Sequence, residues 1–131
     1  MASQLKVDTI TGVTTAGSIA VTGEGNSTTT NLQQGLCKCW INFDGSAGSI
    51  AAADSFNSSG LTDTATGKQT ISMSNAMSND DYSAMATCNN NTLICSRVSS
   101  KATGSYASTM TTPGNTDTDV RNSTTVHGDL A

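Results

Sequence analysis

The sequence is poor in the residues that build a hydrophobic core. Hydrophobic residues make up 35% of the 131 residues and aromatic residues 4%, both below the usual share of a globular domain. Burying so few apolar side chains offsets little of the conformational entropy that a lone chain loses on folding. The length allows one small domain with an arm. We therefore predict that the chain folds and functions together with partner subunits.

Charge is also scarce, at 12% of residues, and the formal net charge is -4. Such a chain offers no basic face to neutralise phosphates, which argues against nucleic acid as a partner. No apolar run is long enough to cross a bilayer, and the first residues carry no basic segment followed by an apolar stretch. We expect no membrane insertion, no secretion signal and synthesis in a cytoplasm.

Most of the polar residues are serine, threonine and asparagine instead of charged residues, and glycine is frequent. Threonine favours extended strands, whereas glycine, asparagine and serine supply tight turns. Turn signals recur about every ten residues, a spacing typical of a sandwich or jelly roll. The sequence therefore predicts an all-β fold, an antiparallel, jelly-roll-like β-sandwich.

Residues 1–36 hold too few apolar residues for a core, and we expect an extended arm that attaches to other proteins and supports trimerisation. Alternation predicts two short extended pieces, at 5–9 and 19–22, around a turn at 11–17. An unordered tail is the alternative. The candidate attachment residues of the arm are Leu5, Val7, Ile10, Ile19 and Val21.

Residues 37–131 are predicted to form the sandwich. A period of two in residues 37–43 places Cys37, Cys39, Ile41 and Phe43 on an inner face. Asp44-Gly45 then predicts a tight hairpin, with residues 48–53 as the returning strand. Further strands are expected at 69–74, 82–88, 92–98, 105–111 and 118–127, where 92–98 returns from 82–88 after a turn at 89–91. The candidate core or subunit-interface residues are Trp40, Ile41, Phe43, Phe56, Ile71, Met73, Tyr82 and Val126.

Trp40 is predicted on the opposite face of its strand from Ile41 and Phe43, together with Lys38 and Asn42. There it covers a second layer of the subunit, packs at a subunit interface, or stacks on a ligand. The sequence leaves these three alternatives open.

Catalytic and metal-binding patterns are weak. His127 is the one imidazole, and no G-x-S-x-G elbow surrounds a serine. A glycan-cleaving site would need two positioned carboxylates, but the aspartates fall in expected turns and strand ends, where they bond local backbone. These aspartates are Asp44, Asp54, Asp63, Asp80, Asp81, Asp117 and Asp119. We expect no enzyme.

The four cysteines form two pairs, Cys37 with Cys39 and Cys88 with Cys95. The first spacing is too short for a zinc knuckle. Cys88 and Cys95 could face each other across a hairpin, but a reducing cytosol disfavours a disulfide. We expect buried thiols, with no metal and no cofactor.

Several segments resemble the small tail-fibre-type structural proteins of marine tailed bacteriophages, of the kind found in cyanophages and pelagiphages. The similar segments span nearly the whole chain and keep their order and spacing. They are residues 5–10, 40–45, 54–57, 75–79 with Tyr82, and 126–131. In those phage proteins, small residues usually stand at the positions of Cys37 and Cys39, and this difference further weakens the case for a metal site.

The resemblance implies a homotrimeric virion component, a tail fibre or fibre tip, that attaches to the host surface by non-enzymatic binding. The arm would dock on other virion proteins, a tail adaptor, nozzle or capsid, and the β-domain would face a host-surface glycan or protein. The alternatives are a capsid decoration or head-fibre protein that stabilises the particle, and a glycan depolymerase spike. The receptor, the host and the position on the virion stay open.

Overall fold

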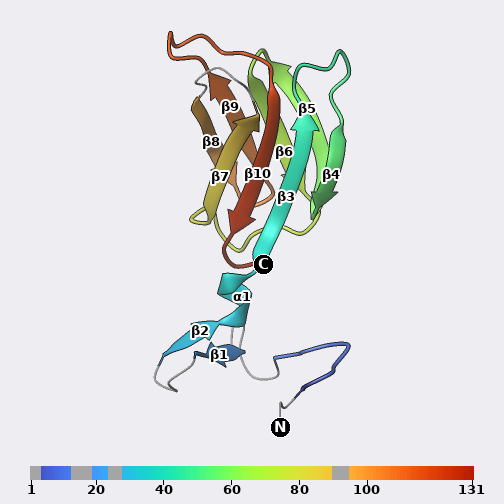
Figure 1. Cartoon of the computed structure of the whole chain (residues 1–131), viewed down its shortest axis with the longest axis vertical. Helices are drawn as coiled ribbons and strands as arrows, with labels where there is room; N and C mark the ends of the chain where they lie inside the picture. Colours follow the sequence, from blue (N-terminus) through green and yellow to red (C-terminus); the bar gives the residue numbers. More distant parts are fainter. Residues whose placement is uncertain (1–3, 13–18, 24–27, 90–94) are drawn as a thin grey trace. The chain divides into compact units, whose positions relative to one another are not determined.

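A computed structural model describes residues 4–12, 19–23, 28–89 and 95–131, with the side chain of residue 95 excepted. The chain divides into two compact units, Met1–Leu36 and Cys37–Ala131 (Figure 1). Among the described residues, no helix has the length and apolar character to cross a membrane.

The N-terminal unit contains a two-stranded antiparallel sheet and one turn of helix. Strand β1 (Ala20–Thr22) pairs with β2 (Thr29–Asn31), and α1 (Leu32–Gly35) follows directly. Asn31 caps α1, because its side-chain oxygen accepts a hydrogen bond from the backbone N–H of Gln34 at 3.1 Å. The piece predicted at 19–22 coincides with β1. Residues 5–9 form no strand, β2 and α1 were not predicted, and most of the predicted turn at 11–17 lies outside the described residues.

The C-terminal unit is all β, as predicted, and its paired strands are antiparallel. One four-stranded sheet has the order β4-β3-β10-β7 and the other has the order β5-β6-β9-β8. The bounds of the strands are β3 (Cys37–Asp44), β4 (Ala52–Phe56), β5 (Ser58–Ala65), β6 (Lys68–Met73), β7 (Ser83–Asn89), β8 (Cys95–Ala102), β9 (Ser105–Thr111) and β10 (Arg121–His127).

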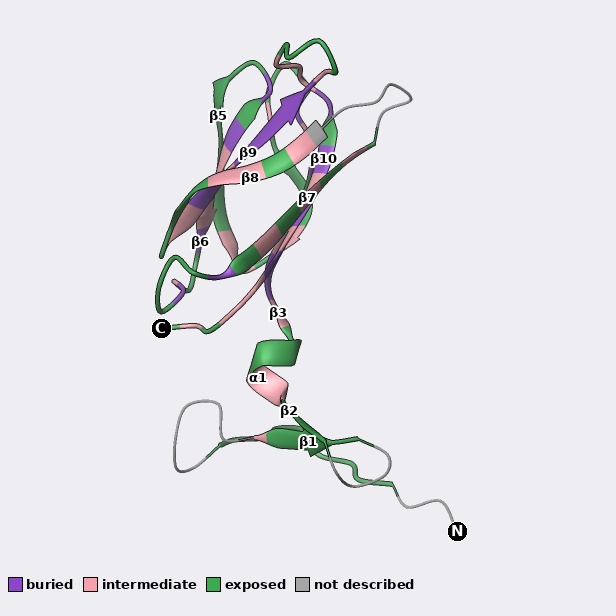
Figure 2. Ribbon diagram, turned by 90° about the vertical axis from the view of Figure 1, so that its left-hand side faces the viewer, coloured by how far each residue is buried: buried purple, intermediate pink, exposed green. Residues whose placement is uncertain are grey.

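The core lies between these two sheets, in a sandwich-like arrangement. Figure 2 shows buried residues on β3 and β10 of one sheet and on β6 and β9 of the other. The buried cluster consists of Cys39, Ile41, Phe43, Ile71, Met73, Met77, Tyr82, Tyr106 and Val126. Period-two alternation in β3 and β10 therefore carries the core, because successive side chains point to opposite faces of a strand.

Polar side chains occupy part of the same interior and bond one another. The Tyr106 hydroxyl lies 2.6 Å from Thr124 Oγ1. Asn122 Nδ2 donates to Ser108 Oγ, and Ser96 Oγ donates to Asn122 Oδ1 at 3.2 Å. Because β10 belongs to one sheet while β8 and β9 belong to the other, these bonds join the two layers.

The predicted hairpin of β7 with β8 is wrong. β7 pairs with β10, whereas β8 pairs with β9 in the opposite sheet. The strands adjacent in sequence therefore lie in different layers, and Cys88 and Cys95 do not face each other across a ladder. The turn predicted at 89–91 falls largely outside the described residues.

Strand positions also differ from the prediction elsewhere. The partner of β3 begins at Ala52, because the loop after Asp44 is longer than a two-residue turn. Strand β5 was not predicted at all. Its residues are mostly exposed, and Leu61 is its one large apolar residue.

Gly45 lies where the loop after β3 approaches the backbone of Val120 closely. Its N–H donates to the carbonyl oxygen of Val120 at 3.1 Å, and a Cβ at this position would lie 2.8 Å from that oxygen. Glycine is required here for contact distance and not for the tight turn that the sequence suggested.

Candidate binding face

The outer face of the β4-β3-β10-β7 sheet carries a row of three large apolar side chains and one threonine. In the strand register Phe56 is opposite Trp40, Trp40 is opposite Thr125, and Thr125 is opposite Met85. Residues directly opposite each other in an antiparallel ladder share a face. Trp40 is half-buried, whereas Phe56 and Met85 are 54% and 61% exposed. We call Phe56, Trp40, Thr125 and Met85 the aromatic row.

Alternation along each strand explains why these side chains point outward. Trp40 follows the fully buried Cys39 and precedes the buried Ile41, and Thr125 stands between buried Thr124 and Val126. The same strands thus supply the core with one set of residues and the outer face with the other.

A polar row runs beside the aromatic row on the same face. Asp54 is opposite Asn42, Asn42 is opposite Ser123, and Ser123 is opposite Thr87. Each of these residues lies two positions from a member of the aromatic row in the same strand. The two rows are therefore about 6.8 Å apart, twice the rise per residue.

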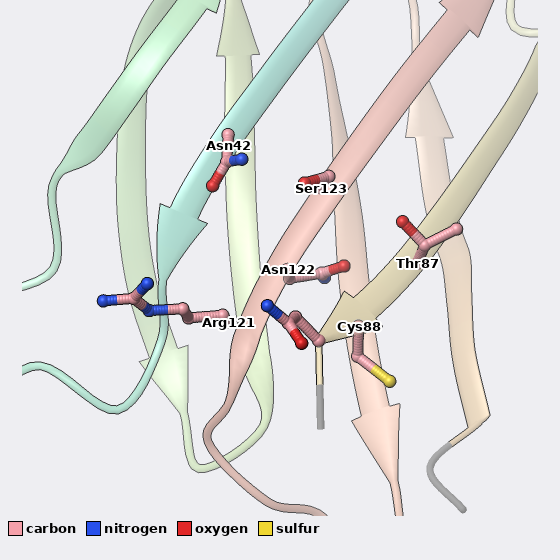
Figure 3. A pocket seen from close by; sticks show the side chains of 7 residues that line it. Asn42, Thr87, Cys88, Arg121, Asn122 and Ser123 are labelled. Carbon is pink, nitrogen blue, oxygen red and sulfur yellow. The ribbon is translucent and has the colours of Figure 1, made fainter. Parts of the chain in front are cut away.

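A hollow of about 180 Å³ opens at the polar row (Figure 3). Asn42 on β3, Ser123 and Arg121 on β10, and Thr87 on β7 line it with amide, hydroxyl and guanidinium groups. The full lining is Asn42, Thr87, Cys88, Asn89, Arg121, Asn122 and Ser123. The site is thus rich in groups that both donate and accept hydrogen bonds.

Arg121 is held in place at the edge of this hollow by Asp44. Its Nε donates to Asp44 Oδ2 at 2.9 Å, and the Asp44 Oδ1 atom accepts from the N–H and hydroxyl of Ser46. The hydrogen bonds from Ser46 and the Arg121 guanidinium together lower the pKa of Asp44 below its ordinary value. Asp44 is therefore ionised at neutral pH and holds the guanidinium through this bond.

Asp117 and Asp119, two more of the predicted carboxylates, serve local structure. Asp117 forms an ion pair with Lys68 at 3.0 Å and accepts from Thr111 at 3.1 Å, and these bonds lower its pKa. Asp119 accepts from the Gly67 N–H at 2.6 Å. Asp44 and Asp117 thus have pKa shifts opposite to the raised pKa that a glycosidase general acid needs.

The cysteines show no metal-binding arrangement in the described residues, where no group of three or more His, Cys, Asp or Glu side chains converges. Cys39 is buried, and Cys37 and Cys88 are half-buried. The side chain of Cys95 lies outside the description. Burial raises the pKa of the Cys39 thiol, so it stays protonated and acts as a small apolar core residue.

A register shift at the start of β3 breaks the predicted alternation. Cys37 stands opposite His127 while Cys39 stands opposite Val126, so Lys38 is the additional residue of a β-bulge in this strand. Lys38 was predicted on the outward face with Trp40, but it is only 5% exposed.

The structure places the predicted residues of the sandwich in two environments. Ile41, Phe43, Ile71, Met73, Tyr82 and Val126 are buried in the core. Trp40 and Phe56 lie together on the outer face instead. Of the arm residues, Ile19 is half-buried, and Leu5, Val7, Ile10 and Val21 are 83%, 52%, 57% and 52% exposed.

Sequence analysis placed Asn42 on the outward face of its strand with Trp40, but it did not identify Met85, Thr87, Arg121 or Ser123 as members of the same face. Alternation within β7 and β10 could indicate which of their residues point outward. It could not indicate that β10 lies between β3 and β7, because that pairing joins segments far apart in the sequence.

Comparison with known proteins gives no relative for this chain: no family model, no curated protein and no solved structure matches it.

Proposed function

We propose that this protein is a structural component of a tailed-phage virion, a tail fibre or fibre tip that forms a homotrimer and binds the host surface without catalysis. The N-terminal unit attaches to other virion proteins, and the β-domain presents its outer surface to the host. The resemblance of segments along the chain to small tail-fibre-type proteins supports this role.

Exposed apolar side chains are the observation that carries the proposal. Leu5, Val7 and Ile10 of the N-terminal unit are each more than half exposed, and Phe56 and Met85 of the β-domain are too. Large apolar side chains gathered on a surface mark contacts with other molecules, because water is a poor environment for them. The N-terminal set suits attachment to the particle.

The small size of the core supports trimerisation. A threefold axis lets three thin chains bury a shared seam and cover the exposed edge strands β4, β5, β7 and β8. Many weak contacts from many fibres then raise the avidity of the virion for its host.

Size-exclusion chromatography with light scattering tests the oligomer directly. We expect a trimer at micromolar concentration, and a stable folded monomer would overturn the proposal. In a variant with Leu5, Val7 and Ile10 changed to Ser, we expect the β-domain to stay folded and attachment to the particle to be lost.

The position of the protein in a density map of the whole particle separates fibre from decoration protein. Density at a tail adaptor or nozzle supports the fibre, whereas density on capsomers supports the alternative of a head-fibre or decoration protein. Release of oligosaccharides from host polysaccharide by the purified protein would instead support a depolymerase.

A further inference from the structure

We infer that the outer face of the β4-β3-β10-β7 sheet is a saccharide-binding platform, on which a sugar ring stacks against Trp40 and Phe56 while its hydroxyls bond to the adjoining polar row. The inference deepens the proposed attachment function and rests on it. It names a site, which does not follow from the resemblance, and it selects a saccharide from the glycan or protein that the resemblance leaves open.

The aromatic row supplies the apolar half of such a site. One face of a pyranose ring presents C–H groups, which pack against the negative face of an aromatic ring. Trp40 and Phe56 are directly opposite each other on neighbouring strands about 4.8 Å apart. Met85 extends the row at its other end, with Thr125 between.

The polar row supplies the hydrogen-bonding half at the required distance. A ring stacked on the aromatic row has its edge hydroxyls about one row away, above Asn42 and Ser123. Amide and hydroxyl side chains each donate and accept, as sugar hydroxyls do. The hollow lined by these groups, about 180 Å³, is smaller than the roughly 300–1,000 Å³ clefts of drug-sized ligands, and it suits one sugar residue.

Arg121 adds an oriented donor to the site. Its Nε is bound to Asp44, and its two terminal nitrogens make no hydrogen bond or ion pair within the described part of the chain. These nitrogens can donate to a ring or hydroxyl oxygen of the sugar. A guanidinium fixed in advance loses little freedom when the ligand binds.

The chemistry of the face favours a saccharide over a second copy of the chain. Apolar character is confined to one row, and the neighbouring row holds Asp54, Asn42 and Ser123 beside an open hollow. A subunit contact would have to bury these polar groups and fill the hollow. A polyhydroxylated sugar ring instead forms hydrogen bonds with the polar groups and occupies the hollow.

The single tryptophan makes the test direct. Trp40 is the one Trp in the chain, so any change in tryptophan emission on ligand binding reports this face. The full-length protein is first applied to an array of defined bacterial oligosaccharides, and the oligosaccharide that binds best is then titrated while Trp emission is followed. We expect saturable binding with a change in emission.

Phe56→Ala is the main variant, because Phe56 is 54% exposed and its removal leaves both the core and the Trp40 probe in place. We expect it to weaken binding about tenfold or more. Asn42→Ala and Thr87→Ala are expected to weaken binding as well. Leu36→Ala, which removes a side chain 53% exposed in the N-terminal unit, is the matched control and should bind as the wild type does.

Three results would overturn the inference. They are no binding to any oligosaccharide on the array by the folded protein, binding that Phe56→Ala leaves unchanged, and dissociation of the oligomer by Phe56→Ala, which would make this face a subunit contact. A trimer that attaches to host cells and fails on the array refutes the platform alone. A monomer in light scattering refutes the proposed function itself.

Discussion

The Tyr106 hydroxyl and Thr124 Oγ1 lie 2.6 Å apart in the core and join its two sheets by a hydrogen bond. Tyr106 belongs to β9 and Thr124 to β10, so the bond crosses between layers. The Cys39 sulfur also lies 4.0 Å from the Tyr106 oxygen. Burial raises the pKa of Tyr106 far above its ordinary value, so the hydroxyl keeps its proton and can donate.

Tyr106→Phe should lower the free energy of unfolding by about 1–3 kcal/mol, because Thr124 Oγ1 is then left buried without this partner. Thr124→Val should cost a similar amount. The double variant should cost less than the sum, with a coupling of about 0.5–3 kcal/mol, because both polar groups are then gone. Urea unfolding at one fixed protein concentration measures the cycle, and additive losses would show that the bond contributes nothing.

Gly67→Ala should destabilise the β-domain strongly. Gly67 has a φ of +68°, and a Cβ there would lie 2.6 Å from the Thr118 nitrogen and 2.7 Å from the Met110 oxygen. Backbone strain alone costs about 1–3 kcal/mol, and displacing two backbone segments adds to it.

Gly48→Ala is the control for Gly67→Ala, since a Cβ at Gly48 meets no atom within 4 Å. We expect its unfolding free energy to stay within about 0.5 kcal/mol of the wild type. Equal thermal unfolding midpoints for the two variants would contradict this account of Gly67.

Stability should fall in acid through Asp44 and Asp117. Both have a pKa lowered from 3.8 in the folded state, Asp44 by bonds from Ser46 and Arg121 and Asp117 by bonds from Lys68 and Thr111. Since the unfolded state binds protons more readily, this stabilisation is present above the unfolded pKa and is lost as the pH falls through the lower folded pKa.

The urea midpoint measured from pH 7 down to about pH 2 tests this pH dependence. We expect the double variant Asp44→Asn with Asp117→Asn to start from a lower midpoint and to change less below pH 4 than the wild type. A variant that keeps the full wild-type slope would assign the acid sensitivity to other carboxylates.

The parts of the fold that local pattern determines could be predicted from the sequence. Alternation in residues 37–43 identified β3, because every second side chain enters the core. The same signal is absent from β5, where Leu61 stands almost alone among exposed polar residues. An exposed edge strand needs no apolar alternation, so it leaves little trace in the sequence.

Pairing between distant strands could not be predicted. The neighbours of β10 are β3 and β7, and no local feature of residues 121–127 specifies either. Sequence adjacency favoured a β7–β8 hairpin, but β8 pairs with β9 in the sheet on the opposite side of the core from β7. The aromatic row was missed for this reason. Trp40 on β3 and Met85 on β7 lie on the same face only because β10 pairs with both strands.

At Asn57 the chain crosses from one sheet to the other. Substitutions there should separate the contribution of its side-chain hydrogen bonds from the cost of its left-handed backbone. It is the one residue between β4 and β5, which lie in different sheets, and its φ is +56°. Its Nδ2 donates to the carbonyl oxygens of Lys38 and Asn75, and its Oδ1 accepts from the Asn75 N–H at 2.7 Å.

Asn57→Gly keeps the backbone conformation and loses these bonds, so we expect the free energy of unfolding to fall by about 1–3 kcal/mol. Asn57→Ala loses the bonds and also strains the backbone, which should cost about 1–2 kcal/mol more. Urea unfolding of both variants gives that difference, and equal stability of the two would mean that the left-handed backbone at this crossover costs nothing.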